Sequence, residues 1–153
     1  MLDSTDRKIL NALQVDSSIS NVELAKRVQL SPSPCLARVR ALEAQKLIRS
    51  YVALLDPQRL GLHLNVFISI SLKQQSRKAL QAFEERVCLR EEVMECYLMT
   101  GESDYLIRVA VADIPALEHF IMEQLTPISQ VEKIRSSFAL KQVKYKTALP
   151  LGA

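Results

Sequence analysis

The sequence predicts an α+β protein built from two small modules, because two different hydrophobic periodicities follow one another along the chain. Residues 1–50 contain three segments with helical spacing, each with a helix-start signal. Residues 64–153 alternate between strand-forming and helix-forming stretches. Between the modules, residues 51–63 begin with part of a strand-forming run (residues 47–55) and then contain Pro57 and Gly61, which interrupt regular structure and mark a linker.

The first two helices are expected from their start signals and apolar stripes. Residues 3–14 carry Asp6 in the first turn, where the helix dipole favours a negative charge. The apolar stripe of this helix is formed by Ile9, Leu10 and Leu13. Ser20 and Glu23 then predict a capping box, in which the hydroxyl accepts from a backbone N–H and the carboxylate reaches back. The second helix has an apolar face formed by Val22, Leu24, Ala25 and Val28.

A third helix is expected to begin at Ser31-Pro32-Ser33-Pro34 and to run to about Gln45. Its inward-facing residues would be Leu36, Val39 and Leu42. Its outward-facing residues would be Ser31, Ser33, Ala37, Arg38, Arg40 and Ala41. A helix, a short turn and a further helix, with the small Ala25 where the two helices approach, form a helix-turn-helix arrangement.

The outer face of the third helix predicts contact with double-stranded DNA, because in helix-turn-helix proteins the start of this helix enters the major groove. Arginine binds guanine through two parallel hydrogen bonds, and hydroxyl groups and helix-start N–H groups bind phosphates. The candidate DNA-binding residues are Ser31, Ser33, Pro34, Arg38 and Arg40. A small three-helix bundle with a solvated basic face is the alternative.

Charge and composition agree with this interpretation. Residues 1–50 hold eight Lys/Arg against five Asp/Glu, whereas the rest of the chain holds twelve of each, so the whole basic excess lies in the first module. No apolar run approaches the ~20 residues that span a bilayer. The N-terminus has no basic-then-apolar signal peptide, and we therefore expect a cytoplasmic protein without a membrane partner.

Residues 64–153 predict a ferredoxin-like βαββαβ domain. The expected strands are residues 65–73, 93–100, 105–111 and 131–141, and the expected helices are residues 77–90 and 114–125. In the first strand, Val66, Ile68, Ile70 and Leu72 point to one face, and Phe67, Ser69 and Ser71 point to the other. Because this second face is mixed in polarity and no chain remains to cover it, we expect a second copy to do so. A half-solvated sheet is the alternative.

The segment from Thr100 to Tyr105 is a candidate site for a free amino acid. Gly101 allows a positive φ and exposes backbone N–H groups, which together with Thr100 would bind a carboxylate, while Asp104 would bind an ammonium group. A hairpin turn closed by a self-capping aspartate is the alternative.

Catalytic machinery is not expected. The sequence has two histidines, no phosphate-binding glycine loop, no Gly-x-Ser-x-Gly elbow and no His/Cys cluster with metal-ligand spacing. The three cysteines predict neither disulfides nor a zinc site. Cys35 opens the third helix, where a lowered pKa would favour redox reactivity, although a packing role is preferred.

Several segments together resemble the Lrp/AsnC (leucine-responsive regulatory protein) family of transcription regulators. The similarity runs nearly end to end and is carried by Asp3-x-x-Asp6-x-x-Ile9-Leu10, Ser31-Pro32-Ser33-Pro34-Cys35, Arg38-Val39-Arg40-x-Leu42-Glu43, Ala53-Leu54-Leu55-Asp56-Pro57, Thr100-Gly101-x-x-Asp104-Tyr105, Ser136-Ser137-Phe138 and Lys146-Thr147-x-Leu149-Pro150. The stretch from Met94 to Gly101 and the closing stretch are most similar to members that control amino-acid catabolism, such as regulators of branched-chain keto-acid dehydrogenase.

The resemblance implies a winged helix-turn-helix head (residues 1–50), a strand and linker (residues 51–63), and an amino-acid-sensing and oligomerisation domain (residues 64–153). It implies dimers that assemble further, to tetramers or octamers, with the effector bound between dimers. The implied effector is a small amino acid, leucine or methionine first. The implied effector-binding residues are Met99, Thr100, Gly101, Glu102, Asp104, Tyr105, Ser136 and Ser137.

Gln29 departs from the family pattern, which has Gly in this turn, and Glu102 is a second position where the effector preference would change. If the backbone at Gln29 needs a positive φ, glutamine costs about 1 kcal/mol there. The main rival function is an amino-acid sensor whose head binds protein instead of DNA, and a redox or sulfur-compound sensor using Cys35 or Cys96 is a more distant third.

Overall fold

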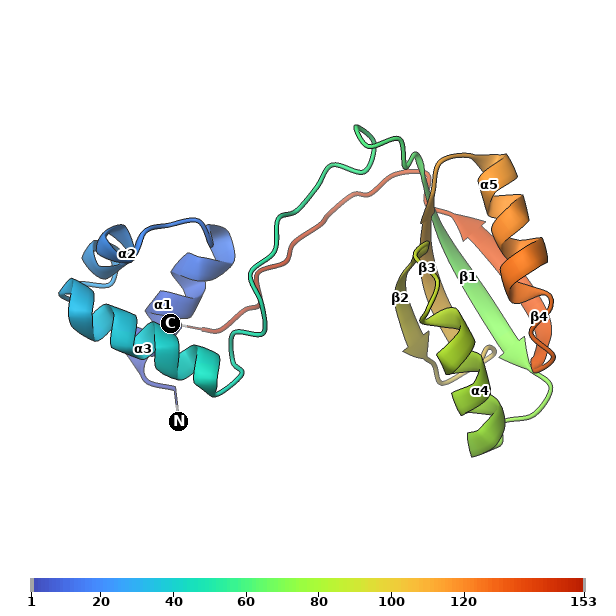
Figure 1. The fold of residues 1–153 in the computed structure, drawn as a ribbon, viewed down its shortest axis with the longest axis horizontal. Coiled ribbons are helices and arrows are strands. Elements are labelled where there is room, and N and C mark those ends of the chain that lie inside the picture. The colour runs from blue at the N-terminus through green and yellow to red at the C-terminus, as the bar shows by residue number, and fades with distance from the viewer. Residues whose placement is uncertain (1, 153) are drawn as a thin grey trace. The chain divides into compact units, whose positions relative to one another are not determined.

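The computed structural model (Figure 1) describes residues 2–152 and divides the chain into two compact units. Unit 1 contains the chain up to Leu54 together with the segment from Val143 onward, and unit 2 is Leu55–Gln142. The chain therefore passes from one unit to the other twice. The sequence analysis had assigned residues 143–153 to the sensing domain, whereas the structure packs their described part with the helices of unit 1.

Unit 1 has the three expected helices, which are α1 (Ser4–Val15), α2 (Asn21–Arg27) and α3 (Pro32–Ala44). A complete capping box begins α1: the Asp6 N–H donates to Asp3 Oδ1 over 2.7 Å, and the Asp3 N–H donates to Asp6 Oδ2 over 3.3 Å. At α2, Ser20 Oγ accepts from the Glu23 N–H over 3.2 Å. These start signals lie in the sequence within four residues of each helix, which is why the helices were predictable.

Both α2 and α3 end in Schellman motifs with a non-glycine residue in the left-handed conformation. Gln29 and Lys46 each have a φ of 59°. The N–H of Leu30 donates to Ala25 O over 2.9 Å, and the N–H of Leu47 donates to Leu42 O over 3.1 Å. The positive φ considered for Gln29 is therefore confirmed.

The core of unit 1 confirms two of the three inward positions predicted for α3, since Leu42 is buried and Val39 packs against the core. Its buried residues are Ile9, Leu10, Leu24, Ala25, Val28, Cys35 and Leu42. Cys35 is completely buried, whereas Leu36 is 37% exposed, so the inward position predicted for Leu36 was wrong. Cys35 and Leu36 are neighbours about 100° apart around the helix, and both are apolar enough to fill the first core position of α3.

The strand expected within residues 47–55, and with it the strand of the segment 51–63, is not formed. Among the described residues, no strand precedes Leu64. Residues 51–56 run without a strand ladder, and Leu54 and Leu55 are 63% and 70% exposed. Strand-forming composition is insufficient here because a strand needs a neighbour to satisfy its backbone N–H and C=O groups.

Unit 2 is the expected ferredoxin-like βαββαβ fold. Its elements are β1 (Leu64–Leu72), α4 (Arg77–Val87), β2 (Val93–Leu98), β3 (Tyr105–Val111), α5 (Ile114–His119) continued by the π-helix η1 (Phe120–Leu125), and β4 (Val131–Phe138). The strands form one antiparallel sheet in the order β2-β3-β1-β4.

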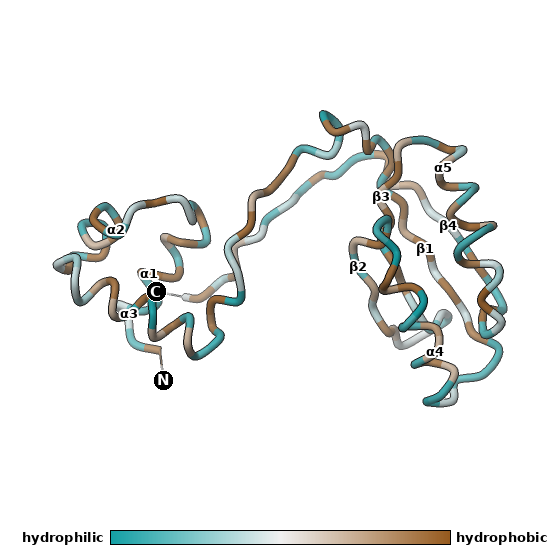
Figure 2. Tube along the Cα trace, viewed as in Figure 1, coloured by the Kyte–Doolittle hydropathy of each residue, from teal (hydrophilic) through white to brown (hydrophobic). Residues whose placement is uncertain are grey.

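Alternation along the central strands positions the core of unit 2. Ile68 faces Ile107 on β3, and Ile70 faces Ile134 on β4, all on the same side of the sheet. Phe83 from α4 completes this side, which Figure 1 shows covered by α4 and α5, and Figure 2 shows the hydrophobic character of β1 and β3. The opposite face has no covering element within the described unit. No helix in the described part of the chain has the length and apolar character to cross a bilayer.

Candidate functional site: the outer face of α3 and the β2–β3 hairpin

The first turn of α3 is an exposed surface with free polar groups. Ser31 is the N-cap residue in an extended conformation, but its hydroxyl makes no capping hydrogen bond, so it is available to an external acceptor or donor. Ser33 and Pro34 are also exposed. Asn21 Nδ2 donates to Pro32 O over 2.8 Å, and this bond fixes the start of α2 to the start of α3.

The two arginines of α3 have different environments. Arg38 lies three residues after Cys35 and four before Leu42, on the same side of the helix as these buried residues. Its Nη1 donates to Asp3 Oδ2 over 2.6 Å and to Asp6 Oδ1 over 2.8 Å. The structure therefore places Arg38 against the start of α1. The outward-facing position that the sequence predicted for Arg38 is not observed.

The ion pairs of Arg38 join two helices through groups that already cap α1. The hydrogen bond from the Asp6 backbone N–H, and then that from Arg38, hold the pKa of Asp3 below its ordinary value. The same carboxylates hold the pKa of Arg38 above its ordinary value. The motif Asp3-x-x-Asp6 thus has a physical explanation that the sequence analysis missed: it caps α1 and fixes α3 to it.

Arg40 is the arginine that remains on the outer face of α3. Ser33, Ala37, Arg40 and Ala44 follow one another at helical spacing, and all four are exposed. Three of these side chains are small, so the backbone of α3 can approach a partner surface closely around a single guanidinium group. A guanidinium on such a face is suited to the guanine edge in a major groove.

The β2–β3 hairpin (residues 99–104) contains the glycine singled out by the sequence. Gly101 has a φ of +124°, as expected, and a Cβ added to it would meet no atom within 4 Å. Backbone conformation, and not crowding, is therefore the reason for glycine here. Thr100 and Glu102 beside it are exposed, and Met99 is 41% exposed. The tip is thus an accessible surface on a single chain.

Asp104 has a different position from the tip. It is 8% exposed, and its Oδ2 accepts from the Leu72 N–H while its Oδ1 accepts from Gln75 Nε2, each over 2.7 Å. These bonds fix the loop between β1 and α4 to the hairpin. An ammonium group, as expected from the sequence, would have to share oxygens that already hold this loop.

Tyr105 is a core residue. Its side chain is 1% exposed, its hydroxyl donates to Glu84 Oε1 over 2.7 Å, and its ring lies 4.5 Å from that of Phe83 between centroids. Burial, followed by the carboxylate of Glu84, raises the pKa of Tyr105 above its ordinary value. The hydroxyl therefore stays protonated and oriented towards α4.

Ser136 and Ser137 lie apart from the hairpin within one chain. They pair with Ile68 and Phe67 on β1, and β1 separates β4 from β3 in the sheet. Two strand spacings correspond to about 10 Å, which is more than a small amino acid spans at its polar end. Being successive residues on a strand, the two serines also point to opposite faces. One chain therefore does not bring all the predicted effector residues together.

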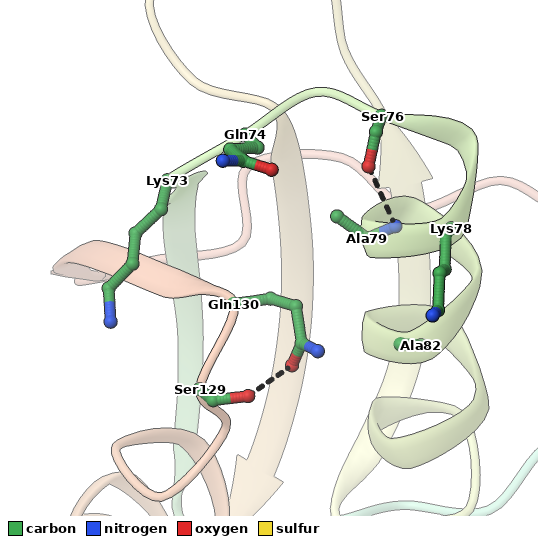
Figure 3. A pocket seen from close by; sticks show the side chains of 8 residues that line it. All are labelled: Lys73, Gln74, Ser76, Lys78, Ala79, Ala82, Ser129 and Gln130. Carbon is green, nitrogen blue, oxygen red and sulfur yellow. Dashed lines mark hydrogen bonds between the residues drawn. The ribbon is translucent and has the colours of Figure 1, made fainter.

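A cavity of about 320 Å³ lies beside the loop that Asp104 holds, and sequence reasoning did not identify it (Figure 3). Its lining residues are Lys73, Gln74, Ser76, Lys78, Ala79, Ala82, Ser129 and Gln130. The Ser76 hydroxyl accepts from the Ala79 N–H and so caps α4. These residues form no recognisable motif, because two stretches far apart in the sequence, residues 73–82 and 129–130, contribute them.

Burial raises the pKa of two of the three cysteine thiols, Cys35 and Cys96. Burial raises the pKa of Cys35, which packs in the core of unit 1 as preferred in the sequence analysis. Burial, and then the nearby Cys88, raise the pKa of Cys96 to about 12. Both thiols are therefore poor nucleophiles near neutral pH. Among residues 2–152, no group of three or more His, Cys, Asp or Glu could hold a metal ion.

Comparison with known proteins assigns both parts of the chain. The AsnC-type helix-turn-helix domain matches residues 2–43, and the Lrp/AsnC ligand binding domain matches residues 65–149. The chain is 45% identical to the Bkd operon transcriptional regulator of Pseudomonas aeruginosa over 150 residues, 98% of each chain. It is 43% identical to the leucine-responsive regulatory protein of Escherichia coli over 148 residues, 97% of this chain and 90% of that protein.

A solved structure is similarly close. A transcriptional regulator from Neisseria meningitidis, solved in complex with L-Met, is 42% identical and superposes with a TM-score of 0.95. The match covers 99% of this chain and 97% of that chain. The matched families and relatives are transcription regulators and not enzymes, in agreement with the sequence analysis.

Proposed function

The chain belongs to the Lrp/AsnC family of DNA-binding, amino-acid-binding transcription regulators, and on this premise we propose how its own residues read DNA and sense the amino acid. The observation that carries the proposal is the outer face of α3. There the free Ser31 hydroxyl, small side chains and the single outward-facing Arg40 form a surface fitted to a major groove.

In this proposal the α3 residues divide into two roles. Arg40 contacts a base edge, and Ser31 and Ser33 hold phosphates. Pro34 fixes the backbone of the first turn, where its missing N–H leaves no helix hydrogen bond unmade. Arg38, proposed from the sequence as a fourth polar contact, acts as a positioning residue, since its guanidinium is engaged by Asp3 and Asp6. DNA contact by Arg38 would require it to leave those carboxylates.

The proposed effector is leucine or methionine. The regulator from N. meningitidis was solved with L-Met, and the relative from E. coli is named for its response to leucine. The proposed binding residues are Met99, Thr100, Gly101, Glu102, Asp104, Tyr105, Ser136 and Ser137. The hairpin tip would bind the effector directly, and buried Asp104 and Tyr105 would hold the hairpin in place.

The effector site is proposed to form between copies of the chain. Because about 10 Å separates the hairpin from Ser136 and Ser137 in one sheet, a second copy has to supply one of the two groups. The uncovered sheet face, with Phe67 and Arg135 on it, supports a homodimer that associates further to tetramers or octamers. Exposed, unpaired residues 51–55 offer the second copy a strand partner.

The proposed targets are genes of amino-acid metabolism, regulated in the cytoplasm. The relative from P. aeruginosa is named as regulator of the Bkd operon, and this similarity supports a related role here.

The test is fluorescence anisotropy of the full chain on a duplex from upstream of its own gene, with a scrambled duplex as control. The measurement is made at two salt concentrations, with leucine, methionine or neither. We expect specific binding that weakens with salt, because each neutralised phosphate contributes about −0.9 to the slope of log K against log salt. Equal, salt-insensitive affinity for both duplexes would contradict the DNA-binding assignment.

A further inference from the structure

The segment from Val143 to Leu151 is attached to α1 by a side chain that makes hydrogen bonds to the backbone of the segment. Gln14 Oε1 accepts from the Leu149 N–H over 2.6 Å, and Gln14 Nε2 donates to Leu149 O over 3.2 Å. One amide thus satisfies both backbone groups of one residue, as a neighbouring strand would. The two residues are separated by 135 positions in the sequence.

Two further contacts complete the attachment. Nη1 of Arg7, two turns earlier on α1, donates to Leu151 O. The side chain of Leu151 packs against the buried core of unit 1, which holds α1 against α3. The segment also carries Lys144 and Lys146 and no acidic residue, so the Lys/Arg excess of unit 1 rises from 8 − 5 = 3 to 10 − 5 = 5.

The attachment is weak enough to be reversible. Val143, Tyr145 and Leu149 are 88%, 64% and 67% exposed, so Leu151 supplies most of the apolar burial. Segments held by a few exposed hydrogen bonds open at much lower free energy than the global fold. A segment held in this way can open without unfolding the helices of unit 1, and a ligand that binds one of the two states more tightly shifts the balance between them.

The segment is also the direct continuation of β4. Only residues 139–142 separate Phe138, the last residue of β4, from Val143. Ser136 and Ser137, placed at the effector site under the proposed function, lie on the same strand. The family match to the ligand binding domain extends to residue 149, although the structure packs residues 143–149 with the helix-turn-helix unit.

We propose that residues 143–151 are a latch: docked on α1 through Gln14 and Leu151, they raise the DNA affinity of unit 1, and effector binding at β4 acts on that affinity by changing how often they are docked. The effector half of this statement rests on the proposed function. The DNA half rests on the attachment alone, because Leu151 packs against the core that holds α1 to α3.

The test compares the full-length wild-type chain with Gln14→Ala, Leu151→Ser and the double variant. Gln14→Ala retains a strong helix former and removes only the amide contacts, so α1 is expected to remain folded. Gln81→Ala is the matched control, because it makes the same change at an exposed position of α4, away from the latch. DNA affinity is measured with and without leucine and methionine, and helix content is followed by circular dichroism.

Limited trypsin digestion reports the latch directly. Cleavage after Lys144 and Lys146, identified by mass spectrometry, is expected to be about threefold or more faster in the double variant and to change in the wild type when the effector is added. The double variant is expected to bind DNA about tenfold more weakly and to lose most of its effector response, with wild-type helix content and wild-type effector binding.

The outcomes separate the two proposals. If the double variant keeps wild-type DNA affinity, or if either single variant loses its helical signal, the latch is overturned, in the second case because the segment is only structural support. If wild-type protein binds DNA but responds to neither amino acid, the effector assignment fails, and the latch is judged by DNA affinity and cleavage alone. If it binds no specific DNA, the proposed function fails, and unchanged cleavage in the double variant overturns the latch independently.

Discussion

Unit 1 and unit 2 differ in the interactions that stabilise each of them internally. Among the described residues, the core cluster of unit 2 has fourteen buried residues and that of unit 1 has seven. In unit 2 the alternation of β1 and β3 decides which face is buried. In unit 1 the Arg38 ion pairs and the Gln14 amide fix helices and tail to one another. The comparison teaches that apolar changes should damage unit 2 most, and polar changes should alter the function of unit 1 most.

Phe83→Ala is expected to give the largest effect. The side chain is fully buried between α4 and the sheet and lies against Tyr105, so its removal should cost about 3–5 kcal/mol of the stability of unit 2. Hydrogen exchange followed by mass spectrometry would show faster exchange in β1 and β3, with α1 to α3 unchanged. Phe138→Ala, at a residue that is 47% exposed, is the control. Equal acceleration in both units would break the comparison.

Asp104→Ala is expected to cost about 1–3 kcal/mol, because the buried Leu72 N–H loses its acceptor. Under the proposed function it also removes the effector response and leaves DNA binding largely intact. Gln75→Ala is the matched variant, since it removes the other partner and keeps the carboxylate. Calorimetric titration with leucine and methionine would measure effector binding by both variants. A retained response in Asp104→Ala would remove this residue from the effector site.

Arg40→Ala and Arg38→Ala are expected to differ in kind. Arg40→Ala should weaken specific DNA binding by about 1–3 kcal/mol and relax sequence preference, with thermal stability unchanged. Arg38→Ala should lower the melting temperature of unit 1 and weaken binding to all duplexes alike, because the Asp3 and Asp6 ties are lost. Anisotropy on a set of single-base-substituted duplexes, together with thermal melts, would measure this. The reverse pattern would assign base reading to Arg38.

Gln29→Gly is expected to give the smallest effect, a stabilisation of at most about 1 kcal/mol, because glycine adopts the positive φ at this turn without strain. Lys46→Gly tests the same conformation at the end of α3. Urea unfolding followed by helical circular dichroism would measure both. A destabilisation in both variants would mean that the side chains make contacts worth more than the strain.

The sequence predicted the elements of unit 2 well and the orientation of the α3 side chains in unit 1 less well, for physical reasons. Val66, Ile68 and Ile70 alternate with polar or mixed neighbours, and a period of two leaves only one buried face. In α3, Cys35 and Leu36 are adjacent and both apolar, so the pattern allowed two helix phases. The structure buries Cys35 in place of Leu36. Arg38 therefore lies against the start of α1 and not on the outer surface.

By itself, the sequence determined the two modules, the three helices, the βαββαβ order and the positive φ at Gly101, because caps, turn residues and hydrophobic period act within a few residues of one another. Only the tertiary structure decided that Arg38 is tied to Asp3 and Asp6, that Asp104 holds the loop after β1, and that Leu149 is bound by Gln14. Each of these is a polar contact between groups at least 29 positions apart. Nothing in the local pattern marks such a contact, since the two partners are far apart in the sequence and the packing of the cores sets their distance in space.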